Sequence, residues 1–231
     1  MNYLYSNLSI PSPQYPAIPK TNVQEWEYVM RREMQEILPS IFLGPYAAAT
    51  KNKRTQLSQF GISHIICIRH HAEANYIKPN FPDQFRYLVL EIADSHTENI
   101  IRFFPEVKEF IDNCLEGNGK CLVHGNAGIS RSAALVIAYI METYGLDYSD
   151  AFRYVGNRRF CIIPNEGFQQ QLIEYEPICK ARAQLAKRDI EKQDSHITGL
   201  KRRLDDDDDD DKGHMAHTSS ASLNDMMIAP S

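Results

Sequence analysis

The 231-residue sequence has few cysteines, no long apolar segment and no leader-like start. Its five cysteines are an odd number without Cys-x-x-Cys spacing, which fits a reducing compartment better than a disulfide framework. The longest apolar run, 133–141, is far shorter than the ~20 residues that a membrane helix needs. Residues 1–19 are polar and carry four prolines, unlike a secretory signal. We therefore expect an intracellular protein that does not bind a membrane.

An excess of positive charge is also missing. The net charge is −5, and seven aspartates from Asp205 to Asp211 account for more than this excess, so the rest of the chain is close to neutral. This balance argues against a broad surface for nucleic acid. Histidines 64, 70 and 71 lack the ligand spacing with cysteine or carboxylate that metal sites show. We predict no nucleic-acid partner, no metal and no cofactor.

The composition changes twice along the chain. Residues 1–24 are rich in proline, and residues 188–231 are polar and charge-blocked, without an apolar period that could pack on a core. We predict a flexible N-terminal arm (1–24), one folded domain (25–187) and a disordered acidic C-terminal tail (188–231). The aspartate run is interpreted as a solvating tail. A docking segment for a basic partner and an engineered cleavage scar remain alternatives.

Between these segments, apolar strands alternate with helical patterns. Strands are expected at 41–43, 64–68, 85–92 and 120–123. Helices are expected at 47–60, 100–115, 148–160 and 167–185, with a short helical or turn-like stretch at 31–36. This alternation predicts an α/β fold with a mostly parallel central sheet flanked by helices. Ligands of such sheets bind beyond the carboxyl ends of the strands, so Asp94 and Gly125 would face one pocket.

The stretch 120–141 carries the strongest functional signal. A short buried strand enters a glycine-bearing loop at 125–128, and a long apolar helix follows. The first N–H groups of that helix have no partner within it, and the helix dipole adds positive potential at the same end. Arg131 lies in the first turn and can donate two hydrogen bonds to one phosphate. The sequence therefore predicts a phosphate-binding site.

The loop HGNAGISRS, residues 124–132, resembles the HCxxGxxR[ST] loop of the cysteine-dependent protein tyrosine and dual-specificity phosphatases. Gly125 stands where that family has its nucleophilic cysteine. The positions that match the dual-specificity version are His124, Ala127, Gly128, Ser130, Arg131 and Ser132. The resemblance extends over roughly 25–180 through MRREMQEILPSIFLGP, HIICIR, NYIKPNF, FRYLVLEIADS, RRFCIIPN and GFQQQLIEYE. It implies a dual-specificity phosphatase-like fold and, because of Gly125, a pseudophosphatase.

The resemblance also assigns roles to residues. It implies phosphate binding by Gly125, Asn126, Ala127, Gly128, Ile129, Ser130 and Arg131. It implies that His124 and Ser132 support the loop and that Asp94 lies at the general-acid position. Asp94 could instead be a helix cap or a surface carboxylate. Without a thiolate no covalent phospho-enzyme can form, and neither the serines nor Cys121, in its apolar strand, is an evident substitute.

Three functions remain open on the sequence. The first is a catalytically inactive protein that binds phosphorylated serine, threonine or tyrosine and anchors or shields its partners. For this function the resemblance implies mitogen-activated protein kinases as partners, contact with an F-box protein of a ubiquitin ligase, and residence in cytoplasm and nucleus. The second is an active phosphatase that uses another nucleophile. The third is a scaffold whose partners bind outside the pocket.

Overall fold

The computed structural model describes residues 15–20 and 25–185. Most of the predicted N-terminal arm and all of the predicted acidic tail lie outside these residues, as does the run from Asp205 to Asp211. Their flexibility and disorder stay predictions. The described residues 25–185 lie within the folded domain predicted at 25–187, and its boundaries stay a prediction.

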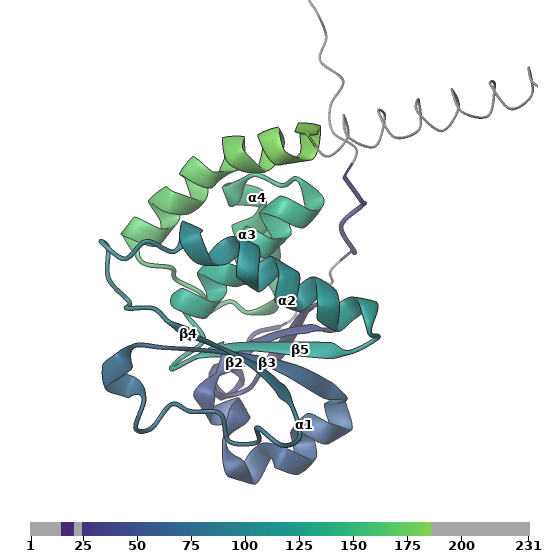
Figure 1. Ribbon diagram of the computed structural model, residues 1–231, viewed down its shortest axis with the longest axis vertical. Coiled ribbons are helices and arrows are strands. Elements are labelled where there is room, and N and C mark those ends of the chain that lie inside the picture. The colour runs from purple at the N-terminus through teal and green to yellow at the C-terminus, as the bar shows by residue number, and fades with distance from the viewer. Residues whose placement is uncertain (1–14, 21–24, 186–231) are drawn as a thin grey trace, which may run out of the picture. The chain divides into compact units, whose positions relative to one another are not determined.

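A five-stranded sheet forms the middle layer of the domain (Figure 1). Its strands are β1 (Gln35–Leu38), β2 (Ile41–Pro45), β3 (Ile62–Arg69), β4 (Arg86–Glu91) and β5 (Lys120–Gly125). In space the order is β1-β2-β5-β3-β4. Only β1 runs antiparallel to its neighbour, whereas β2, β5, β3 and β4 pair in parallel. The prediction of a mostly parallel sheet is confirmed.

Helices cover both faces of the sheet (Figure 1). On one face lie α2 (Phe104–Glu116), α3 (Arg131–Tyr144), α4 (Tyr148–Arg158) and a last helix that spans 166–185. On the other face lies α1 (Arg54–Phe60), preceded by 3-10 turns at Tyr46–Ala49 and Lys51–Lys53. Among the described residues, no helix is long and apolar enough to span a bilayer.

The core is centred on α3, whose first eleven residues are all buried. The apolar run that the sequence shows at 133–141 is therefore buried on every side, between the sheet and the other helices of that face. A smaller cluster around Leu57 and Ile65 fills the opposite face beneath α1. Because α3 is enclosed, its N-terminus is held rigidly at the carboxyl ends of β5 and β3.

Several boundaries differ from the predictions. The stretch expected to be helical or turn-like at 31–36 contains the end of a 3-10 turn (Tyr28–Arg32) and the start of β1. The helix expected at 47–60 begins only at Arg54, because Thr50 has extended backbone angles (φ −75°, ψ 162°) that interrupt it. Gly61, the residue directly after the helix predicted at 47–60, ends α1 in the left-handed conformation, φ +76°.

Part of the predicted flexible arm packs on the domain. Ile18 lies against the core cluster, and the Tyr154 hydroxyl donates a hydrogen bond to the Pro19 carbonyl over 2.9 Å. The segment 15–20 is thus anchored to α4, which differs from the prediction of a loose arm. Proline content alone did not reveal this contact, because the partners lie more than 130 residues away in the sequence.

Candidate phosphate-binding site

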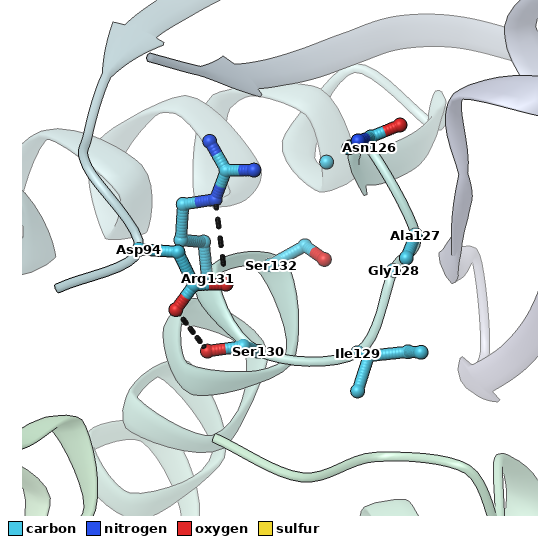
Figure 2. Close-up of a pocket in the computed structure, with 9 residues that line it drawn as sticks. Asp94, Asn126, Ala127, Gly128, Ile129, Ser130, Arg131 and Ser132 are labelled. Carbon is cyan, nitrogen blue, oxygen red and sulfur yellow. Dashed lines mark hydrogen bonds and ion pairs between the residues drawn. The ribbon is translucent and has the colours of Figure 1, made fainter. Parts of the chain in front are cut away.

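The residues of the HGNAGISRS loop surround a pocket of about 260 Å³ at the carboxyl end of β5 (Figure 2). Asp94, from the connection after β4, lies on the same pocket, which confirms that Asp94 and Gly125 face one cavity although they are 31 positions apart. The described lining residues are Asp94, Gly125, Asn126, Ala127, Gly128, Ile129, Ser130, Arg131 and Ser132. The pocket is open, so the loop is not collapsed around Gly125.

A close backbone contact sets the shape of the loop. Gly128 has φ +66°, and a Cβ atom there would lie only 2.4 Å from the carbonyl group of Gly44 in β2. The Tyr46 N–H donates to the Asn126 carbonyl over 3.1 Å, which ties the other side of the loop to the end of β2. At position 128 only glycine allows both the positive φ and the close approach of the Gly44 carbonyl. The loop therefore wraps against β2 in one conformation.

Arg159 holds the loop from beneath. Its side chain is completely buried at the end of α4. The guanidinium donates to the carbonyls of Gly128 (2.8 Å) and Ala127 (3.1 Å). It also donates to the carbonyls of Arg31 and Glu33 and to the side-chain oxygen of Gln35. These contacts join the loop to the segment before β1. Arg159 directly follows α4, which ends two residues earlier than the predicted helix 148–160.

Arg131, the predicted phosphate ligand, is held by a carboxylate. Both terminal nitrogens of its guanidinium donate to Glu73, over 2.6 and 3.0 Å, and one also donates to the Ile92 carbonyl over 3.1 Å. Burial raises the pKa of Glu73, but hydrogen bonds from Arg131 and the His70 backbone outweigh it, so the pKa is lowered. The pair orients the guanidinium at the pocket wall and compensates its charge.

Asp94 closes one side of the pocket (Figure 2). One carboxylate oxygen accepts hydrogen bonds from the Ser130 hydroxyl (2.6 Å) and from the Asn165 amide (2.8 Å). The other oxygen lies 3.8 Å from Nε of Arg131. Asp94 caps no helix in the described part of the chain, and it lines the pocket. It therefore occupies a place from which a carboxylic acid could reach a bound phosphate ester, and its charge is partly balanced by Arg131.

Gly125 leaves room for a larger side chain. A Cβ atom built there would meet the Ser132 hydroxyl at 3.5 Å, the Ile68 carbonyl at 3.7 Å and the Ser132 Cβ at 3.9 Å, all ordinary contacts. The Ser132 hydroxyl is buried and has no hydrogen-bond partner among the described residues. An unpaired buried hydroxyl costs stability. A buried hydroxyl without a described partner therefore lies beside position 125, where a larger side chain would fit.

The other candidate groups near the loop are held in unreactive forms. His124 is completely buried, and this burial lowers its pKa to about 4, so the ring is neutral at pH 7. Burial raises the pKa of Cys67 to about 11. The Cys114 thiol and complete burial raise the pKa of Cys121 as well. No cysteine is among the described lining residues, and in the described part of the chain no cluster of His, Cys, Asp and Glu could hold a metal.

Replacing Glu73 by glutamine should destabilise the domain. The side chains of Arg131 and Glu73 are 8% and 13% exposed, so a neutral partner leaves a buried guanidinium poorly compensated. We expect the free energy of unfolding at pH 7 to fall by about 1–3 kcal/mol. Because the folded-state pKa of Glu73 is lowered, the contribution of its charge is present above pH 4.5 and is lost as the pH falls through the folded value.

Urea unfolding of the wild type and Glu73→Gln at pH 7 and pH 3 measures both effects. The gap between the two proteins should narrow at pH 3. Glu91→Gln is the matched control, because the Glu91 side chain is 59% exposed, lies 3.8 Å from Arg69, and its loss should change little at either pH. An equal difference in free energy of unfolding at both pH values would contradict a stabilising charge on Glu73.

Three residues of the site carry no role in the sequence interpretation: Glu73, Arg159 and Asn165. Arg159 and Asn165 lie in RRFCIIPN, a segment that supports the family resemblance, but nothing in it marks which side chain reaches the loop. Glu73 lies in the polar connection after β3 and gives no signal in the sequence. Its partner Arg131 is 58 positions away, so only the fold brings them together.

The fold and this loop define a class of protein. The profile of the dual specificity phosphatase catalytic domain matches residues 41–178, and the chain belongs to this family. Among its relatives is the serine/threonine/tyrosine-interacting protein of Homo sapiens, 64% identical over 171 residues, which cover 73% of this chain and 77% of the relative. Serine/threonine/tyrosine-interacting protein A of Xenopus laevis is 58% identical over 202 residues, covering 84% and 91%.

A solved structure agrees with this assignment. The crystal structure of the human tyrosine phosphatase-like serine/threonine/tyrosine-interacting protein is 69% identical and matches with a TM-score of 0.63. The match covers 64% of this chain and 97% of the other. The chain is thus similar to phosphatase-like interacting proteins within the dual-specificity family, and the family resemblance inferred from the HGNAGISRS loop is confirmed.

Proposed function

We propose that this protein binds phosphorylated serine, threonine or tyrosine side chains of partner proteins in the loop pocket and does not hydrolyse them. The observation that carries the proposal is the open pocket with an intact backbone cradle and a held arginine, combined with glycine at the nucleophile position. A binding protein of this kind anchors its partners or shields their phosphate from phosphatases.

Charge supports retained affinity for phosphate. A thiolate at position 125 would place an anion against an anionic ligand, and at ~4 Å and an effective dielectric of 20 such a pair costs on the order of 4 kcal/mol before screening. Glycine removes this repulsion. The N–H groups of the loop, the N-terminus of α3 and Arg131 all remain available to a phosphate group.

The chemistry of the pocket supports the absence of turnover. Ser130 donates to Asp94, and its hydroxyl also accepts from the Asn165 N–H over 3.1 Å, so it takes part in fixing the rim. Ser132 is buried and has no basic partner among the described residues. Phosphate esters hydrolyse extremely slowly without a catalyst, so binding and electrostatics alone give negligible turnover.

The partners proposed from the family resemblance are mitogen-activated protein kinases and an F-box protein of a ubiquitin ligase, in cytoplasm and nucleus. The names of the curated relatives support interaction with proteins in general. The scaffold alternative, in which partners bind away from the pocket, makes the opposite prediction for Arg131.

Replacing Arg131 should abolish phosphate-dependent binding. Because Arg131→Met alone leaves Glu73 unpaired, the variant to use is Arg131→Met/Glu73→Gln, which removes both charges of the pair. We expect its affinity for a phosphotyrosine peptide with neutral flanks to fall about 30- to 100-fold, the loss expected for a two-pronged charge-assisted contact. Fluorescence anisotropy measures this affinity, and inorganic phosphate should compete with the peptide.

Two controls accompany this measurement. The unphosphorylated peptide gives the baseline, and Glu73→Gln alone separates the effect of the carboxylate from that of the guanidinium. Circular dichroism shows whether each variant is folded. Unchanged capture of the phosphopeptide by the folded double variant would contradict the proposed function and favour the scaffold.

A further inference from the structure

A second pocket adjoins the phosphate-binding loop. It has a volume of about 310 Å³ and lies between the loop and the segment that precedes β1. The described lining residues are Tyr28, Arg31, Arg32, Pro45, Ala47 and Ala127. Ala127 lines both pockets. In addition, Pro45 of this pocket pairs with Gly125 of the first in the register of β2 and β5, so the two cavities are neighbours.

The walls of the second pocket are joined rigidly to the loop. One terminal nitrogen of the buried Arg159 guanidinium donates to the Arg31 carbonyl and to the Ala127 carbonyl, over 3.1 Å in each case. Both carbonyls belong to residues that line the second pocket. The backbone that carries the Arg31 and Arg32 side chains is therefore fixed relative to the phosphate site. A surface depression without a function would not need this support.

The pocket is positively charged. Two arginines line it, and no carboxylate is among its described lining residues. Within the described residues neither arginine side chain forms an ion pair or a hydrogen bond, whereas Arg131 pairs with Glu73 and Arg159 donates to backbone carbonyls. Tyr28, 77% exposed, adds an aromatic wall beside them. An anionic group that also has an apolar stem fits this lining.

We propose that the second pocket binds an acidic side chain, a carboxylate or a second phosphate, of the same partner segment whose phosphorylated residue occupies the loop pocket. The inference rests on the proposed function and adds a sequence preference to it. Because the pockets share a wall and successive residues of an extended segment are spaced ~3.5 Å apart, the acidic residue lies within a few positions of the phosphorylated one.

Peptide binding tests the inference. Phosphotyrosine peptides carry either neutral flanks or one glutamate, placed in turn at each of the three positions on either side; a further peptide carries phosphoserine at the best position. The proteins are the wild type, Arg31→Gln/Arg32→Gln, and the control Lys53→Gln/Arg54→Gln. The control removes two positive charges at the start of α1, outside both pockets.

We expect one glutamate position to tighten binding to the wild type about fivefold, and phosphoserine there to tighten it more. Both gains should shrink at high salt and vanish in Arg31→Gln/Arg32→Gln, while the neutral-flanked peptide binds all three proteins alike. The phosphoserine arm distinguishes a pocket for phosphate from a pocket for any carboxylate, according to whether its gain exceeds that of glutamate.

Each other result has a separate meaning. A glutamate gain that persists in Arg31→Gln/Arg32→Gln, or no gain at any position, overturns the second pocket and leaves the proposed function standing. Failure of the wild type to bind any phosphopeptide overturns the proposed function. In that case, binding of an unphosphorylated acidic peptide that depends on Arg31 and Arg32 would still support an anion site here, but not the link between the pockets.

Discussion

Gly125→Cys should convert this protein into an active phosphatase, with turnover of an aryl phosphate at least about 10³-fold above the wild type, which stays at background. The cysteine Cβ would have only ordinary contacts, and the unpaired Ser132 hydroxyl is placed to donate to the new sulfur. The N-terminus of α3 and Arg131 lower the pKa of a thiol at this position. Asp94 would then protonate the leaving oxygen.

Steady-state assays of four proteins test this expectation. Gly125→Ala fills part of the same space without a thiol and should stay at background. Gly125→Cys/Asp94→Asn should lose about 10²-fold of the gained activity, as expected when a general acid is removed. Turnover by the wild type at a rate close to that of Gly125→Cys would mean that another nucleophile operates. This result would contradict the proposal of a binding protein without phosphatase activity.

Replacing Arg159 should have the largest effect on stability. Arg159→Met removes the donors for four backbone carbonyls and for the side-chain oxygen of Gln35. The bonds to the Gly128 carbonyl and to Gln35 are buried and the other three are partly buried, so acceptors left without a partner carry a desolvation penalty. We expect the free energy of unfolding to fall by about 3–5 kcal/mol, and phosphopeptide affinity to fall with it, because the loop loses its support.

The neighbouring Arg158 provides a matched control in the same helix. Its side chain is only partly buried and forms no ion pair among the described residues. Arg158→Met should change the free energy of unfolding by less than about 1 kcal/mol. Urea unfolding of both variants measures the difference, and equal losses would contradict the special role of Arg159.

Much of the fold could be predicted because it depends on local patterns. The continuous apolar segment at 64–68 indicates a strand buried on both faces, and Gly61 marks the end of the helix before it. The common edge for Asp94 and Gly125 follows from parallel strands alone. The strand β1 was missed since its four residues are too few to show an alternation, and its place at the sheet edge depends on pairing with β2.

The residues of the candidate site could be predicted where they lie in one continuous segment. They could not be predicted where the fold brings distant segments together. The loop 124–132 supplies its own backbone donors, so its residues and their common pocket follow from one segment. Glu73 and Arg159 act over distances of 58 and about 31 positions, and ordinary polar residues at such separations carry no period or motif. Side-chain partners of this kind are specified by packing, which the sequence does not display.

The Arg159 contacts have a consequence for how this protein could be inhibited. One guanidinium donates both to the segment before β1 and to the loop, so it links the two. A molecule that separated residues 31–33 from α4 would weaken the support that Arg159 gives the loop, without binding in the phosphate pocket. Small polar cavities are difficult targets for drugs, and the contact between residues 31–33 and α4 is an alternative target.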